Sequence, residues 1–501
     1  MNHESLTMNN EPKIMEEQSL KHKAASGMIW SAIQKYSTML IKLISGMILA
    51  RLLMPEDYGA IGMLLIFISL AEVFIDAGFG SALIQKKNPT QTDYSTVFYF
   101  NIVMSVILYG LVYLSAPAIA EFYRMPILCN VLRVQGLILF IYAFNVIQRN
   151  QIRKNLKFKI LSKITIISSI ISLTVTVILA YMGLGVWSLV AQEFLGILIP
   201  CIFFWMTMNW RPTWEFSWTS FKEMFGFGSF MFLTHLFTTF SQRINGLLVG
   251  RWFNPATMGY YTKADSFSRF ATLSIAGVMI QTTYPLYASV QDDRERLINM
   301  VKRITSTLAY ITVPMLSILI LIAEPLIVML YSDRWLPSVP YFQILCIGGM
   351  AGCLQSVNQQ TIAAIGKSKV FFVLTIVKQC VGIASQVIGL IVWGIWGLLA
   401  GLVFSSWFDY LVNITMVSKY VGYKNYQQLI DLSPIFLASG ISFVVGYLIG
   451  NWLELSFYVD ALVKVAIFLI VYMLWSVIFK PESYTYTLSI VKMFISKKKN
   501  K

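Results

Sequence analysis

Long hydrophobic runs of about twenty residues follow one another along almost the whole chain, separated by short polar loops. A helix of that length crosses the hydrocarbon core of a membrane, whereas the strands of a membrane barrel are shorter and alternate polar with apolar residues. The pattern therefore predicts an all-α polytopic membrane protein with about 14 transmembrane helices. The expected spans are residues 27–50, 60–84, 94–118, 128–148, 162–182, 185–207, 225–249, 266–290, 304–330, 340–364, 370–393, 396–418, 433–451 and 458–479.

Part of the polar pattern occurs twice, at the constant spacing that separates Arg51 from Arg251. The matching pairs are Lys35 and His235, Thr38 and Thr238, Lys42 and Gln242, Gly46 and Gly246, Arg51 and Arg251, Pro55 and Pro255, and Gly59 and Gly259. Transporters commonly use a duplicated helical bundle to build two lobes that move around a central site. We therefore expect two pseudo-symmetric halves related by a twofold axis along the membrane normal, with both arginines at the outer ends of their spans.

The predicted spans and loops divide the chain into five regions. These are a cytoplasmic N-terminal tail (1–23), a first lobe with spans one to six (24–210), a second lobe with spans seven to twelve (211–420), spans thirteen and fourteen (421–480), and a basic cytoplasmic tail (481–501). The first region is polar and lacks an early apolar core, so we do not expect it to be a cleavable signal peptide.

Composition and charge support the membrane class. Hydrophobic residues make up 57% and charged residues 13% of the 501 residues, whereas a soluble domain carries about 25% charge. Lysine and arginine gather in the loops after even-numbered spans and at the C-terminal end, which predicts that both termini are cytoplasmic. The net charge of +15 follows from this topology and from attraction to anionic membrane lipids, so we expect no nucleic-acid partner.

Signatures of an enzyme or a metal site are weak or missing in the sequence. The five cysteines all fall in apolar segments without a Cys-x-x-Cys pair, and the three histidines do not cluster with them, so we expect no metal. The phosphate-binding loop Gly-x-x-x-x-Gly-Lys-Ser/Thr does not occur, which excludes ATP hydrolysis by that route. Because no loop is long enough for a catalytic domain, we expect a protein without enzymatic activity or a cofactor.

Charged side chains inside the spans are the most informative residues, because each costs about 2.5–3.5 kcal/mol at a helix centre. Lys35 and Lys42 are separated by close to two helical turns, so both point to one face of the first span. The corresponding stripe of the seventh span contains His235, Gln242, Arg243 and Asn245. Together the two stripes predict a cationic cavity between the lobes, which suits an anionic cargo because a low dielectric strengthens attraction to phosphate.

Other intramembrane charges have more than one interpretation. Arg269 lies near the start of the eighth span, where its side chain either reaches the interface or joins the cationic cavity. Glu72 and Asp76 lie in the second span. For the remaining acids we favour a role as buried structural partners; they are Glu193, Glu324 and Asp409.

Several stretches, in this order and spacing, resemble a known family. They are ARLLMPEDYG (50–59), DAGFGSALIQ (76–85), STVFYFN (95–101), GVWSLVAQ (185–192), GYYTKA (259–264), SVQDD (289–293), AEPL (323–326) and WLP (335–337). The chain is similar to oligosaccharide flippases of the polysaccharide transporter family, within the multidrug/oligosaccharidyl-lipid/polysaccharide exporter superfamily. Within that family it looks closest to the branch of the colanic acid and teichuronic acid exporters. The resemblance covers residues from about 24 to 420.

The resemblance implies a fold, a cargo and a place in the cell. The fold is two six-helix lobes in a V that opens alternately to each side, plus two C-terminal helices. The cargo is an oligosaccharide repeat unit on undecaprenyl pyrophosphate, flipped across the bacterial cytoplasmic membrane for surface polysaccharide biosynthesis. Its lipid tail stays among the membrane lipids, and polysaccharide polymerase or assembly proteins are candidate partners.

The resemblance also implies roles for individual residues. Related peptidoglycan-precursor flippases use basic residues on their first, second and eighth helices, which assigns substrate binding to Lys35, Lys42 and Arg269 here, with Arg243 as a further cavity cation. The second helix departs from that pattern, because it carries acids. The candidates for a polar or ion-coupling role in the cavity are Glu72, Asp76, His235, Gln242 and Asn245.

Two other function classes remain as alternatives. A multidrug or cation antiporter of the same superfamily would be expected to have an acidic cavity for cationic drugs, and the basic first span argues against it. A membrane polysaccharide polymerase or ligase would need a large outer loop with clustered catalytic residues, which the sequence lacks.

Overall fold

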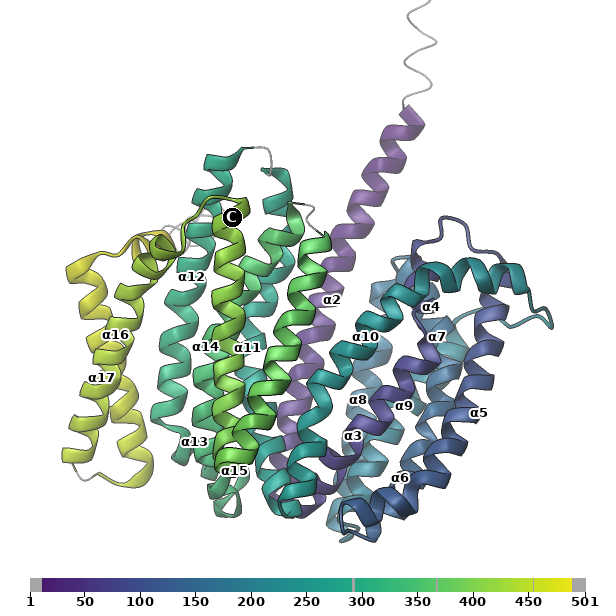
Figure 1. Ribbon diagram of the computed structural model, residues 1–501, viewed down its shortest axis with the longest axis horizontal. Helices are drawn as coiled ribbons and strands as arrows, with labels where there is room; N and C mark the ends of the chain where they lie inside the picture. The colour runs from purple at the N-terminus through teal and green to yellow at the C-terminus, as the bar shows by residue number, and fades with distance from the viewer. Residues whose placement is uncertain (1–10, 291–292, 366–367, 454, 489–501) are drawn as a thin grey trace, which may run out of the picture. The chain divides into compact units, whose positions relative to one another are not determined.

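The computed structural model describes the backbone of residues 11–290, 293–365, 368–453 and 455–488, and Figure 1 shows its helices. Every regular element in these segments is a helix. Contacts between the elements divide the chain into two compact units, Met1–Gly259 and Tyr260–Lys501. The expected all-α fold class is confirmed.

The first unit is a bundle built around α3 and α7. Its helices are α2 (Glu11–Leu52), α3 (Pro55–Asp76), α4 (Phe79–Gln85), α5 (Gln91–Phe122), α6 (Ile127–Gly136), α7 (Ile138–Lys154), α8 (Phe158–Tyr181), α9 (Val186–Thr207) and α10 (Trp218–Trp252). Helix α8 packs between α2 and α9, α5 packs on α6 and α7, and α10 packs on α3 (Figure 1).

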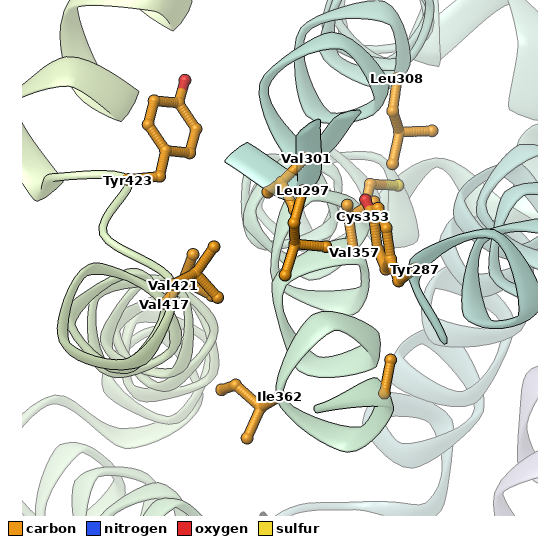
Figure 2. Packing of buried hydrophobic residues seen from close by; sticks show 11 residues of the cluster. Tyr287, Leu297, Val301, Leu308, Cys353, Val357, Ile362, Val417, Val421 and Tyr423 are labelled. Carbon is orange, nitrogen blue, oxygen red and sulfur yellow. The ribbon is translucent and has the colours of Figure 1, made fainter. Parts of the chain in front are cut away.

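The second unit begins within α11 and has its own hydrophobic core. Its elements are α11 (Pro255–Ser289, first turn in the first unit), α12 (Arg294–Leu321), α13 (Ala323–Tyr331), the 3-10 helix η1 (Asp333–Ser338), α14 (Val339–Ala364), α15 (Ser368–Tyr420), α16 (Asn425–Trp452) and α17 (Phe457–Phe479). Figure 2 shows Leu297 and Val301 of α12 beside Cys353 and Val357 of α14, all at most 2% exposed.

The helices account for all the predicted spans. In the described residues, ten segments are long and apolar enough to cross a membrane. One of them, Val370–Tyr420, contains two predicted spans. They are separated by a break in the helix at Trp393 and Gly394. The first, seventh and eighth predicted spans correspond to α2, α10 and α11, whose composition is more polar. These three helices carry the predicted cavity cations.

Three predicted spans differ from single continuous helices. The second breaks where Ala77 and Gly78 adopt positive φ values of 44° and 78°, separating α3 from α4. The fourth is divided at Leu137 and the ninth at Ile322. A break within a span frees backbone groups, which are tolerated at membrane depth only inside protein or beside water. Gly78 satisfies the first condition, because a Cβ there would collide with the carbonyl of Gly228 on α10.

The helix joints follow the expected repeat. Arg51 lies in the last turn of α2 and Arg251 in the last turn of α10. Pro55 then starts α3 and Pro255 starts α11. Proline is suited to the first position of a helix, because the missing N–H would have no partner there and its φ is already helical.

The two joints also contact each other in a reciprocal way. A Cβ on Gly59 would collide with the carbonyl oxygen of Pro255, and a Cβ on Gly259 would collide with that of Pro55, far inside the 3.0 Å that real Cβ atoms keep. When residue i contacts j and the equivalent of j contacts the equivalent of i, the segments are related as in a twofold interface. The contact supports the duplication inferred from the sequence.

A second turn also occurs once in each half, but its two copies do not have the spacing that separates Arg51 from Arg251. Gly185 has φ 52° and ψ −127° just before α9, and Gly394 has φ 61° and ψ −137° within α15. Each is followed by an aliphatic residue and a tryptophan, Trp187 or Trp396. This backbone region is open essentially to glycine alone. The two halves thus share a turn, at a spacing slightly longer than that of the first repeat.

The unit boundary differs in position from the predicted lobe boundary. The sequence predicts lobes of residues 24–210 and 211–420, but α10 packs on α3 and α4 and so joins the first compact unit. The division into lobes at residues 210 and 211 remains a prediction. The expected N-terminal tail, residues 1–23, is helical from Glu11 onward as part of α2, and its first ten residues lie outside the described part.

Candidate substrate-binding site

Lys35 and Lys42 lie on one uninterrupted helix, α2, which supports the prediction that they share a face. Lys35 is half-buried and Lys42 is exposed. Neither lies within nine residues of an end of α2. Neither lysine therefore caps the helix.

Another face of α2 is fixed against α8 and α9 by polar contacts. Gln192 of α9 donates a 2.7 Å hydrogen bond from its amide nitrogen to the hydroxyl of Ser45. Ser162 of α8 donates a 2.8 Å bond to the carbonyl oxygen of Trp30. These contacts hold α2 in one rotation about its axis, so the lysine face is positioned by packing.

The predicted polar stripe of α10 is only partly on one surface. His235, Gln242 and Arg243 are exposed, whereas Asn245 is 5% exposed. Asn245 directly precedes Gly246, which packs so closely on α3 that a Cβ there would collide with the carbonyl oxygen of Gly62. The first three side chains are available to a ligand, and Asn245 belongs to the packed side of the helix.

Asp76 has a structural role at the break between α3 and α4. Its carboxylate accepts a 3.2 Å hydrogen bond from the backbone N–H of Gly80, in the first turn of α4. It also interacts electrostatically with His235 and Arg153. A carboxylate that caps a broken helix satisfies N–H groups that the break would otherwise leave unpaired.

Glu72 lies one turn before Asp76 and joins a network of charges from several helices. It interacts electrostatically with Glu193 of α9, Arg243 of α10 and Arg149 of α7. Glu193 interacts in turn with Arg243 and with Lys42. The structure therefore brings two predicted cavity cations, Lys42 and Arg243, to the same carboxylate, Glu193.

Sequence reasoning missed the central place of Glu193. Its carboxylate accepts a hydrogen bond from the side-chain nitrogen of Gln135 on α6, and Gln135 is fully buried. The available signal was a lone acid in an otherwise apolar span, which favoured a structural partner. Its four interaction partners come from four other helices, which no local pattern reveals.

Arg269 belongs to the second unit. Its Nε lies 2.8 Å from a carboxylate oxygen of Asp265, one turn earlier on α11, and its side chain is 52% exposed. The pair is held on the helix surface rather than inside the unit. The approach of Arg269 to the first-unit cations remains a prediction.

A bridge outside the spans fixes the start of α10. Lys86, between α4 and α5, lies 3.1 Å from Asp93 of α5 and 3.0 Å from Glu223 of α10. Burial lowers the pKa of Lys86, but its bonds to Glu223 and Asp93 outweigh that effect and raise the pKa above its usual value. The bridge therefore ties α10 to the bundle with a stably protonated lysine.

Comparison with known proteins shows similar chains in polysaccharide biosynthesis. A family model described as "Polysaccharide biosynthesis protein" matches residues 48–340. The teichuronic acid biosynthesis protein TuaB of Bacillus subtilis (strain 168) is 27% identical over 360 residues, which cover 71% of this chain and 74% of that protein. The lipopolysaccharide biosynthesis protein WzxC of Escherichia coli (strain K12) is 22% identical over 439 residues, which cover 86% of this chain and 88% of WzxC.

A solved structure shares the fold. The lipid II flippase MurJ, in an inward closed conformation, superposes with a TM-score of 0.71 at 16% sequence identity, covering 90% of this chain and 98% of MurJ. At this identity the likeness concerns the arrangement of helices.

Proposed function

The chain belongs to the polysaccharide biosynthesis protein family, and we propose that it is a flippase for lipid-linked oligosaccharides. In this proposal it moves repeat units carried on undecaprenyl pyrophosphate across the cytoplasmic membrane for surface polysaccharide biosynthesis. Relatives named for teichuronic acid and lipopolysaccharide biosynthesis, and the fold shared with a lipid II flippase, support a cargo that is both a lipid and a saccharide.

The observation that carries the proposal is the convergence of Lys42 and Arg243. They come from α2 and α10, the two helices related by the duplication, and both interact with Glu193. Cations inside spans cost about 2.5–3.5 kcal/mol each, so intramembrane charges are retained mainly where they act. An anionic headgroup is the ligand that two such cations select.

Four cations are assigned to the pyrophosphate: Lys35, Lys42, Arg243 and Arg269. Hydrogen bonds between ionised donors and phosphate oxygens are roughly twice as strong as neutral ones. The lipid tail remains in the bilayer while the two lobes open alternately to each side. No covalent step is needed, and we propose that the protein has no catalytic activity of its own.

The test removes the cations of the first span. In Lys35→Ala/Lys42→Ala, export should stop while the protein remains folded and inserted, because deleting an intramembrane charge eases insertion. The measurement is the amount of lipid-linked repeat units on the inner leaflet, with protein level determined in parallel.

The matched control is Lys157→Ala/Lys163→Ala, which also removes two lysines but from the exposed region around the start of α8. It should export normally. Full export by the first double variant at normal abundance would mean that the α2 lysines do not hold the cargo, and the proposal would fail.

We also propose an orientation with both termini in the cytoplasm, supported by the basic loops after even-numbered spans. Cysteines introduced singly at Asn155 and Phe122, in a background without native cysteines, test this. An impermeant thiol reagent applied to intact cells should label position 122 and spare position 155. The reverse pattern would invert the topology.

A further inference from the structure

Gln135 and Glu193 form a hydrogen-bonded pair that is incomplete. The Gln135 amide nitrogen donates to the Glu193 carboxylate. The other end of the same amide, Oε1, is buried and has no hydrogen-bond partner among the described residues, and Gln135 is 0% exposed. A buried acceptor without a donor costs about 1–3 kcal/mol, so a native protein normally provides one.

A protonated Glu193 supplies the missing donor. A carboxylic acid presents one O–H donor while its other oxygen still accepts, whereas an ionised carboxylate can only accept. A protonated Glu193 can therefore donate its O–H to Oε1 of Gln135 and keep the bond from the amide nitrogen. In that state the amide is satisfied at both ends.

We propose that Glu193, with Glu72 beside it, is a proton-binding site that fills when the anionic headgroup binds. The proton comes from solvent and is held on a Glu193 carboxylate oxygen; no other bond is made or broken. This inference rests on the proposed function, because the cargo is the anion that triggers proton uptake.

Charge balance in the network supplies the coupling. The groups that face the two carboxylates are Lys42 of α2, Arg149 and Tyr142 of α7, and Arg243 of α10. Without cargo, Lys42 and Arg243 offset the charge of Glu193, and Arg243 and Arg149 offset that of Glu72. A doubly esterified pyrophosphate is a dianion and competes for the same cations.

Headgroup binding thus leaves the two like-charged, half-buried carboxylates with less compensation. Two carboxylates that share a site do not both remain ionised easily, so one takes up a proton. Binding of the headgroup and binding of the proton then favour each other by the same free energy, as linkage requires.

The experiment measures protons taken up when a ligand binds the full-length protein in lipid nanodiscs. The probe is a synthetic short-chain prenyl pyrophosphate esterified to a sugar. Calorimetric titration in two buffers with different ionisation enthalpies gives the proton count. We expect uptake of about one proton per bound ligand, and an affinity that falls by up to about tenfold per pH unit across the pH range in which binding takes up the proton.

Glu193→Gln is the decisive variant, because glutamine imitates the protonated acid and can still bond both ends of the Gln135 amide. It should bind the probe with proton uptake abolished and with an affinity that varies little with pH. Infrared difference spectra should show a protonated carboxyl band on ligand binding to the wild type, and this band should be missing in the variant.

The matched control is Glu121→Gln, a glutamate at the exposed end of α5. It should behave as the wild type in both measurements. Ligand binding by the wild type without proton uptake, or unchanged uptake by Glu193→Gln, would overturn the inference and leave the flippase proposal standing. Failure of the wild type to bind the pyrophosphate probe at all would instead refute the proposed function.

Discussion

Two groups of charged residues inside helices, one around Lys378 in the second unit and one around Glu193 in the first, are arranged in opposite ways. In the second unit, Lys378 of α15 is 6% exposed and donates a 3.3 Å hydrogen bond to Asn413, while interacting electrostatically with Asp409. In the first unit, Lys42 and Arg243 are exposed. The Lys378 side chain is buried and bonded to its own neighbours, and we call Lys378 and Asp409 the closed pair. Lys42 and Arg243 lie at a surface.

The difference indicates which charges bind a ligand and which support the fold. Lys378 is buried and Asp409 is half-buried, so removing either one leaves a partly desolvated charge with less compensation. An exposed cation has lost less hydration and retains unused donors for an incoming anion. The same residue types, lysine and an acid within a span, therefore carry different roles according to burial.

The largest expected effect is the loss of one member of the closed pair. Lys378→Ala should destabilise the protein by about 1–3 kcal/mol, because it leaves the half-buried carboxylate of Asp409 and the amide oxygen of Asn413 without their cation. Lys42→Ala should change stability far less. Thermal unfolding of both purified variants in detergent measures the contrast.

The control for this contrast is Lys378→Met/Asp409→Leu, which replaces the whole pair with apolar residues of similar size. It should recover most of the stability lost in the single variant, since apolar replacement of a buried ion pair is often neutral. It should also export cargo. A double variant that is stable but inactive would show that the closed pair has a function after all, and the comparison would break.

A smaller effect is expected at the bridge outside the membrane. Glu223→Gln removes one of the two acids from Lys86, and because Glu223 is 62% exposed the loss should be only about 0–1 kcal/mol. The pKa of Lys86 is raised in the folded protein. The stabilisation is therefore fully present below the ordinary lysine pKa of about 10.4 and is lost as pH rises through the folded-state pKa.

The free energies of unfolding of the wild type and of Glu223→Gln should accordingly differ by a constant amount between about pH 6 and 9. That amount is the contribution of the bridge. The difference should shrink only in strongly alkaline buffer. High salt should reduce it as well, because exposed charges are screened. If the difference instead changes only below about pH 6, a titratable group other than Lys86 is its source.

Local periodicity was enough to predict some features. The spacing of Lys35 and Lys42 predicts a shared face once α2 is helical, because two turns bring a side chain back to nearly the same direction. The repeated Arg51 and Arg251 predict equivalent helix ends, and both lie in last turns. These features depend on residues close to one another in sequence.

Features that depend on distant residues could not be predicted in the same way. Ala77 adopts a left-handed conformation that its residue type disfavours, and the surrounding packing must impose it. Glu193 meets Gln135 across the bundle, and neither residue differs by itself from a polar side chain buried for structural reasons. Tertiary packing decides such cases.

The reciprocal contact of Gly59 and Gly259 has a consequence for how the two repeats can evolve. A side chain gained by either glycine would collide with the proline that starts the other repeat's helix. A mutation in one copy is thus opposed by the other copy, although the two are far apart in the gene. The two glycine positions are therefore under one shared steric constraint, since each excludes a side chain through the other repeat.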